Sequence, residues 1–292
     1  MPSTDVEPTQ PKGWLSADPA GLAQRTTRAW ELFTAVVNSV DLAGPTRSAH
    51  RSARDLVIGL GSWPDSRGIP ELSADAHAGN TAAEPLKATA ARLAASHAEA
   101  TDSEVRSSVA RSLDQTRDWL VSGDLTETGL LATASPLGPL PMGTVVHAAV
   151  YQLAITARDL LPAGAAPQPE LDELGLVALL DATGAVAART GLVASAAAVG
   201  RRVAVAIEVF DGGWTCTLGD NSSSPAVLAP EELLLDLAGG RADFTAMSRE
   251  IRFRDARGLL ALSPVVDAIP DLPGGPMLRR TATLARLVGG RR

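Results

Sequence analysis

The sequence contains a single cysteine, Cys216. One thiol cannot form an intramolecular disulfide, and it cannot supply a zinc site built from several cysteines. No run of eighteen apolar residues is present, so the sequence predicts no transmembrane helix. Residues 1–13 are polar and contain proline, without the basic and then apolar pattern of a signal peptide. We therefore expect a cytoplasmic protein.

Positive charge and aromatic side chains are also scarce. The chain has 26 Lys and Arg against 33 Asp and Glu, a net charge of −7. Such a chain does not attract the phosphate backbone of nucleic acid or an anionic membrane, so we expect neither as a partner. Aromatic residues make up 3%, which predicts that any ligand pocket is lined mostly by aliphatic side chains. Lys12 and Lys87 are the only lysines in an alanine-rich chain, a coding bias typical of a GC-rich, for example actinobacterial, genome.

The common catalytic motifs are absent. The sequence has no G-x-G-x-x-G before a helix, no Walker A motif, no G-x-S-x-G and no H-E-x-x-H. The four histidines, His50, His77, His97 and His147, lie far apart in the sequence. We interpret the first three as surface or packing residues. His147 differs, because it lies early in a helix that is expected to point into the protein core.

Hydrophobic spacing predicts a long helical region and then a mixed one. Apolar residues recur at helical intervals over 16–41, 52–60, 82–99, 101–122, 141–160 and 171–199, with a polar loop over 69–80. The segments 82–99 and 101–122 form either two helices or one long, bent helix, and Gly184 and Gly191 are candidate breaks within 171–199. Alternation over 203–210 and the turn at 211–213 predict a hairpin with 214–218, followed by a helix from Pro230 and a strand near 251–254. We expect a disordered tail over 1–14, a helical bundle over 15–199 and a small α+β domain over 200–292.

Three segments carry a resemblance to a known family. They are 43–46 with 52–57, 140–141 with 152–160, and 230–234 with 240–241. In these segments the chain resembles the mycothiol-dependent maleylpyruvate isomerase family, part of the wider DinB-like group of metal-binding four-helix bundles. The resemblance implies a mainly α fold, with a DinB-like four-helix bundle followed by a small α+β domain similar to sterol-carrier proteins.

The chain departs from the family at the positions that the resemblance assigns to metal ligands. The family motif Asp-Leu-Val-x-His ends here in Gly59. The motif Glu-x-x-x-His-x-x-Asp-Leu has Gln152 and Thr156 at the ligand positions and keeps only Asp159-Leu160. A catalytic zinc needs about three strong donors, whereas glycine offers none and Gln and Thr are neutral. We therefore expect no metal and no other cofactor.

Gln152 and Thr156 are four residues apart, so they share one helical face, which we expect to point toward Gly59. Three interpretations remain open: a relic site filled by waters or side chains, an enlarged ligand pocket, or a metal site that the alignment misplaces. We favour a pocket for a small, mostly apolar organic molecule, with His147 as a further candidate. Its chemistry would be an isomerisation or cyclisation driven by positioning and hydrogen bonding. The alternatives are a metal- and mycothiol-dependent isomerase or transferase with a rebuilt site, and a non-catalytic carrier or interaction protein.

Overall fold

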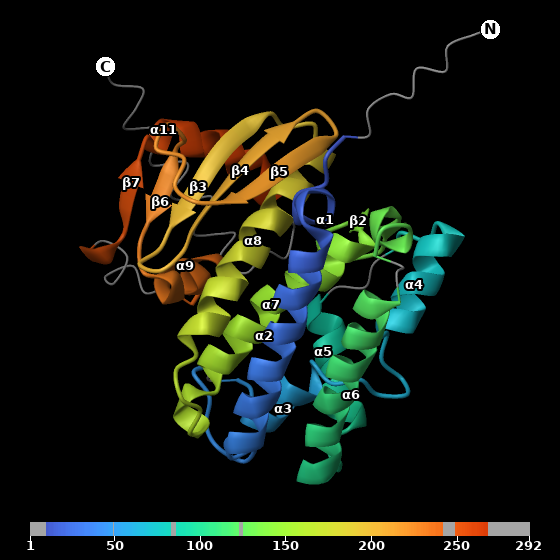
Figure 1. Ribbon diagram of the computed structural model, residues 1–292. Coiled ribbons are helices and arrows are strands. Elements are labelled where there is room, and N and C mark those ends of the chain that lie inside the picture. Colours follow the sequence, from blue (N-terminus) through green and yellow to red (C-terminus); the bar gives the residue numbers. More distant parts are fainter. Residues whose placement is uncertain (1–9, 49, 83–85, 123–124, 242–248, 268–292) are drawn as a thin grey trace, which may run out of the picture.

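Four long helices form the centre of the molecule. They are α2 (Pro19–Ser39), α6 (Asp102–Val121), α7 (Met142–Asp159) and α8 (Pro169–Arg189). In the computed structural model α7 packs along α8, and α2 contacts α6, α7 and α8 (Figure 1). The structure describes residues 10–48, 50–82, 86–122, 125–241 and 249–267. Shorter elements before α8 are α1 (Trp14–Ala17), α3 (Ala53–Ile58), α4 (Ile69–Ala78), α5 (Leu86–Ser96), the 3₁₀ turns Thr128–Leu130 and Leu161–Ala163, and the paired segments β1 (Ala132–Thr133) and β2 (Leu140–Pro141).

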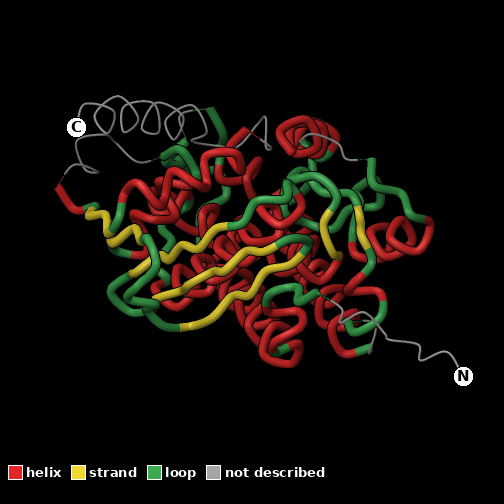
Figure 2. Tube along the Cα trace, turned by 90° about the horizontal axis from the view of Figure 1, so that it is seen from above, coloured by secondary structure: helices red, strands yellow, loops and turns green. Residues whose placement is uncertain are grey.

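A five-stranded sheet follows α8, in the order β5-β4-β3-β6-β7. All neighbours are antiparallel except β3 and β6, which are parallel. The elements are β3 (Ala194–Val199), β4 (Ala204–Phe210), β5 (Gly213–Leu218), β6 (Ala226–Leu228), α9 (Glu231–Ala238), β7 (Arg252–Arg254), α11 (Ala256–Leu259), a 3₁₀ turn (Leu260–Leu262) and α12 (Ser263–Asp267). Figure 2 shows the strands side by side along one flank of the helices.

The sheet packs on the bundle through α8. Helix α8 contacts both β4 and β5, and Val205, Ile207 and Val209 of β4 belong to the same apolar core as the long helices. This is the face that the alternation over 203–210 predicts. The mainly α fold is thus confirmed, whereas the division into a bundle over 15–199 and a domain over 200–292 remains a prediction. Residues 242–248 and 268–292 of that domain lie outside the described residues.

Helix starts follow the capping residues. Ser52 and Asp55 form the expected capping box at α3, and Thr101 forms one with Glu104 at α6. Asp18 caps α2, whose first residue is Pro19. These local signals explain why the helix positions near 19, 52 and 101 are predictable from sequence.

Three predicted segments are wrong. The loop expected over 69–80 is helix α4, which begins at Ile69 with Pro70 in its first turn and ends at Ala78, where Gly79 adopts a left-handed conformation. The helix expected to run to residue 199 ends at Arg189, and residues 194–199 pair with β4 and β6 instead. Alanine favours helices, but sheet pairing overrides that preference here. The option of one bent helix over 82–122 is also wrong, because α5 and α6 are separate.

The expected tail over 1–14 falls partly outside the described residues, which begin at residue 10. From there the chain pairs with β5. The Trp214 amide donates to the Pro11 carbonyl at 3.0 Å, and the Gly13 amide donates to the Trp214 carbonyl at 2.9 Å. The expectation of a disordered tail therefore does not hold for residues 10–14.

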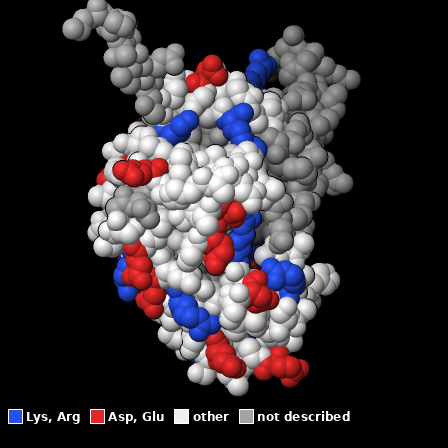
Figure 3. All heavy atoms as spheres, turned by 90° about the vertical axis from the view of Figure 1, so that its right-hand side faces the viewer, with Lys and Arg blue, Asp and Glu red and all other residues white. Residues whose placement is uncertain are grey.

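Surface charge agrees with the acidic but mixed composition. Figure 3 shows acidic and basic groups interspersed on the face beside α4 and α6. Within the described ranges, no helix combines the length and the apolar character needed to cross a membrane.

Glycine at position 184 is required by the packing of the sheet on α8. A Cβ there would lie 2.5 Å from Trp214 Cδ1. Alanine normally stabilises a helix interior by about 1 kcal/mol relative to glycine, but this clash should reverse the sign. We expect Gly184→Ala to lower the free energy of unfolding by about 1–3 kcal/mol, measured by urea denaturation.

Gly59→Ala is the matched control, because a Cβ at that position meets its nearest atom, Ala90 Cβ, at an ordinary 3.5 Å. Equal effects of the two substitutions would contradict the steric explanation.

Candidate functional site

Helix α7 carries three of the four residues that the sequence singles out. Gln152 is half-buried and Thr156 is 8% exposed. At 100° per residue they lie on one face, whereas His147, nine residues before Thr156, lies on the opposite side. The structure therefore does not bring His147 together with Gln152 and Thr156.

Gly59 lies at the C-terminal end of α3, a helix that contacts both α5 and α7. Its φ of −64° is helical, so the backbone does not require glycine. A Cβ would meet Ala90 of α5 first, at 3.5 Å. The Cβ direction of Gly59 therefore points toward α5, where a methyl group would make ordinary van der Waals contact.

The hydroxyl of Thr156 is available for other contacts. The hydroxyls of Thr34, Thr116 and Thr183 each donate to the carbonyl four residues earlier, at 2.7–2.8 Å. Neither the Thr156 hydroxyl nor the Gln152 amide has a hydrogen-bond partner among the described residues. The two side chains thus offer a hydroxyl and an amide on the same helix face.

His147 belongs to a second, deeply buried centre. Its Nδ1 lies 2.9 Å from Asp181 Oδ2 of α8, and the two side chains are 1% and 0% exposed. The other oxygen, Asp181 Oδ1, accepts from Trp214 Nε1 at 2.8 Å and from the Trp14 amide at 3.3 Å. One carboxylate therefore connects α1, α7, α8 and β5. We call these four residues the Asp181 centre.

Two further groups lie beside the Asp181 centre. The Arg25 guanidinium stacks on the Trp14 ring at 4.0 Å. Burial lowers the pKa of Arg25, and the negative charges of Asp18 and Asp181 oppose that change. Burial, reinforced by Asp181, raises the pKa of the Cys216 thiol well above its ordinary value. Cys216 is therefore a neutral, packed side chain, as its position in a strand predicts.

Of the four residues in the Asp181 centre, the sequence identifies only His147. Asp181 could have been identified, because it is the only charged residue in the apolar stretch 174–188. A buried carboxylate requires donors, so such a residue indicates a partner elsewhere in the fold.

A cluster of ion pairs lies where α9 meets the bundle. Asp236 of α9 pairs with Arg47 at 2.8 Å and with Arg158 at 3.0 Å, and Arg158 also reaches Asp172 at 3.4 Å. These four residues form the α9 cluster, whose charges hold α9 against α7 and α8.

Asp159 makes a separate ion pair beside the α9 cluster. This α7 residue is 1% exposed and accepts a two-pronged interaction from Arg241 at 2.6–3.0 Å. Asp159 and Arg241 are both among the residues that carry the resemblance, and the structure brings them together. The hydroxyl of Tyr151 is buried nearby and has no hydrogen-bond partner among the residues that the structure describes, and burial raises its pKa.

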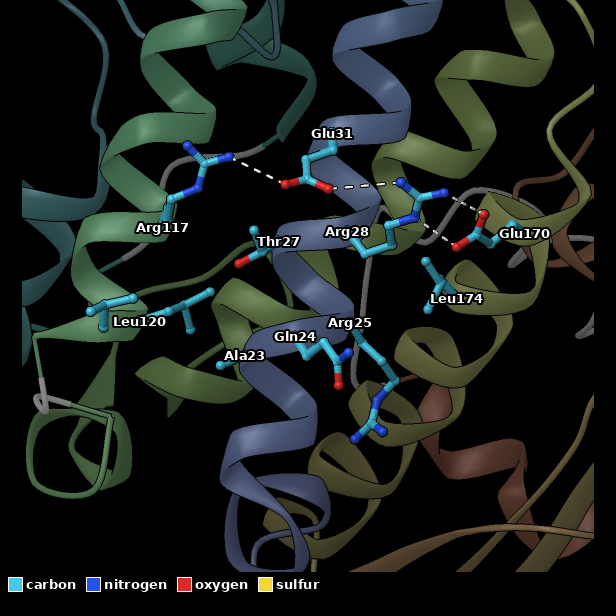
Figure 4. A pocket seen from close by; sticks show the side chains of 11 residues that line it. Ala23, Gln24, Arg25, Thr27, Arg28, Glu31, Arg117, Leu120, Glu170 and Leu174 are labelled. Carbon is cyan, nitrogen blue, oxygen red and sulfur yellow. Dashed lines mark hydrogen bonds and ion pairs between the residues drawn. The ribbon is translucent and has the colours of Figure 1, made fainter.

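Two surface grooves lie away from the predicted residues. The larger, of about 650 Å³, lies between α2, α6 and α8. Figure 4 shows Arg28 bridging Glu170 and Glu31, while Arg117 reaches Glu31 from α6. These charges satisfy one another across an apolar floor. The second groove, of about 410 Å³, lies between α4 and α6.

Neither groove is lined by Gly59, Gln152, Thr156 or His147. In the part of the chain that the structure describes, no three His, Cys, Asp or Glu side chains gather in a way that could hold a metal ion.

Comparison with known proteins supports a distant fold relationship. No protein-family model matches the sequence, and no curated protein matches it. Among solved structures, the chain is similar to the crystal structure of the mycothiol-dependent maleylpyruvate isomerase and to that of a histidine-to-alanine mutant of that enzyme. For each the TM-score is 0.50 at 11% identity, covering 82% of this chain and 93% of the other. At this identity the likeness shows the fold alone.

The α9 cluster makes stability depend on pH. Burial raises the pKa of Asp172 to about 6; Arg158 opposes the shift, and Glu232 and Asp236 add to it. Because the pKa in the unfolded chain is about 3.9, the folded protein binds more protons between these values, and stability falls as pH rises from about 4 to 6. We expect the free energy of unfolding of Asp172→Asn, minus that of the wild type, to increase by about 1–3 kcal/mol between pH 4 and pH 7. Urea unfolding at the two pH values would measure this difference.

Asp220→Asn is the control, because its effect on stability should change with pH in the opposite direction. Asp220 pairs with Arg254 at 2.7 Å, which lowers its pKa, so its contribution is lost on acidification. A stability difference for Asp172→Asn that stays constant with pH would contradict the assignment.

Proposed function

We propose that this protein uses a maleylpyruvate isomerase fold to bind a small, mostly apolar organic molecule without a metal. The proposed binding site consists of the Gln152 and Thr156 face of α7 together with Gly59 of α3, a helix that contacts α7. The observation that carries the proposal is that the amide and the hydroxyl lie on one helix face and have no hydrogen-bond partners among the described residues.

The donor set at this face does not fit a catalytic transition metal. Such a site needs about three strong donors, usually imidazole, carboxylate or thiolate. Gly59 has no side chain, and Gln152 and Thr156 offer neutral oxygens, which are weak ligands for these ions. His147 cannot complete the set, because it lies on the other side of α7 and its Nδ1 pairs with Asp181. We therefore assign no chemical step to a metal.

Hydrogen bonding is the chemistry available to these residues. The Gln152 amide donates and accepts, and the Thr156 hydroxyl does the same. Such groups can orient a carbonyl or hydroxyl group of a ligand that is otherwise held by apolar contacts. An isomerisation or cyclisation of the bound molecule would then rest on positioning and on stabilisation of developing charge. A carrier would use the same contacts without turnover.

The assignment of positions 59, 152 and 156 can be tested by introducing the metal ligands that the family motifs have there. We expect the triple variant Gly59→His, Gln152→Glu, Thr156→His to bind zinc or nickel at one ion per chain, because it supplies two imidazoles and one carboxylate. A Cβ at position 59 meets Ala90 at an ordinary 3.5 Å, so the first carbon of the new side chain is accommodated. Isothermal titration calorimetry with zinc would measure the stoichiometry.

The control for metal binding is a triple variant with alanine at the same three positions, which should bind no zinc. Failure of the histidine and glutamate variant to bind metal while remaining folded would reject the alignment of these positions. Stoichiometric zinc in the wild-type protein would instead favour a metal- and mycothiol-dependent enzyme.

The binding face itself can be tested with the ligand that the protein retains. We expect native mass spectrometry of the wild-type protein to detect an organic adduct, and Gln152→Ala to reduce its occupancy at least several-fold by removing a hydrogen bond. His147→Ala should reduce the occupancy less, because His147 lies on the opposite face. Equal or reversed effects would place the binding site elsewhere, and an adduct without turnover of candidate substrates would indicate a carrier.

A further inference from the structure

The Asp181 centre leaves buried polar atoms without partners. His147 is 1% exposed and Thr144 is 0% exposed. In the described part of the chain, neither His147 Nε2 nor Thr144 Oγ1 has a hydrogen-bond partner. Most buried polar atoms in proteins have hydrogen-bond partners, because an unpaired one loses its bonds to water without replacement. Two such atoms on one helix therefore require an explanation.

Among the described residues, the Thr144 hydroxyl has no partner. The hydroxyls of Thr34, Thr116 and Thr183 donate to the carbonyl four residues earlier, whereas the buried hydroxyl of Thr26 in α2 also lacks a partner. Thr144 lies in the first turn of α7, and the residue four positions earlier, Leu140, belongs to β2. The usual intrahelical acceptor is therefore missing, and the hydroxyl remains free to contact another molecule.

The hydrogen-bond direction at His147 follows from Asp181. An ionised carboxylate only accepts, so Nδ1 of His147 carries the proton that is shared with Asp181. In the neutral ring, Nε2 then has a lone pair that requires a donor.

Thr144 and Nε2 of His147 have complementary requirements. The two residues are three positions apart, so they are neighbours on the same face of α7. A hydroxyl group placed between them can donate to His147 Nε2 and accept from Thr144 Oγ1. A carboxylate would fail at Nε2 because it has no proton to donate, and an aliphatic group would satisfy neither atom.

We propose that His147 Nε2 and Thr144 Oγ1 form a buried binding position for a hydroxyl group. The hydroxyl belongs either to water or to an organic ligand that reaches this centre. This position is separate from the Gln152 and Thr156 face, because it lies on the other side of α7 and shares no residue with it. The nitrogen resonances of His147 therefore test this position whether or not a ligand binds at Gln152.

The test is nuclear magnetic resonance of the whole protein labelled with ¹⁵N-histidine. We expect Nδ1 of His147 to be protonated and Nε2 to resonate at the position of a hydrogen-bonded acceptor. His147→Gln assigns the signals by their loss. Thr144→Val, which keeps the shape but removes the hydroxyl, should move the Nε2 resonance toward that of a free lone pair and leave Nδ1 in place. Thr156→Val on the opposite face is the matched control and should change neither signal.

Three results would overturn the proposal. They are an Nε2 of wild-type His147 that resonates as a free lone pair, a proton on Nε2 in place of Nδ1, and an Nε2 resonance that Thr144→Val leaves unchanged. A fold check by circular dichroism on each variant separates these results from unfolding. The readout concerns His147 alone, so a loss of ligand at Gln152 would not affect it.

Native mass spectrometry then distinguishes the two sources of the hydroxyl. An adduct that Thr144→Val loses and Thr156→Val retains assigns an organic hydroxyl to this position. A hydrogen-bonded Nε2 in a protein whose mass is that of the chain alone assigns water.

Discussion

Asp181 is a carboxylate with no exposed surface, and its hydrogen bonds hold the sheet and the N-terminal segment to the bundle. It accepts from an imidazole of α7, an indole of β5 and a backbone amide of α1. Burying a charge is unfavourable unless donors surround it. The fold therefore has to bring together segments that are far apart in the sequence, from Trp14 to Trp214. The bare surface of Gly184 allows the Trp214 ring to approach α8 closely enough for its bond to Asp181.

Different faces and turns of helix α7 contact three different parts of the structure. One side joins the Asp181 centre through His147. The C-terminal end carries Arg158 and Asp159, which bind α9 and Arg241. The remaining face presents Gln152 and Thr156. In a helix of 18 residues these contacts fall on different turns or directions, so a change at one face need not disturb the others.

The parts of the fold that the sequence predicts are those governed by local rules. Apolar spacing and capping residues place α2, α3, α6 and α7, and alternation places β4. Contacts between segments that are distant in the sequence could not be predicted. The alanines over 194–198 favour a helix, yet they form a strand because β4 and β6 lie beside them. His147 can be chosen as a candidate from its position, but Asp181 and Trp214 become its neighbours only through tertiary packing.

The buried carboxylates that the structure describes all have partners within the chain itself. The buried carboxylates of the described residues are Asp159, Asp172, Asp181, Glu231 and Asp236. Asp159, Asp172 and Asp236 face arginines, Asp181 faces His147 and two N–H groups, and Glu231 accepts the amides of Arg202 and Val203. A divalent cation is bound tightly where carboxylates or imidazoles converge without other partners. Here each buried carboxylate already has donors from the chain. The Thr144 hydroxyl and His147 Nε2, which lack partners among the described residues, suit a neutral group that can both donate and accept.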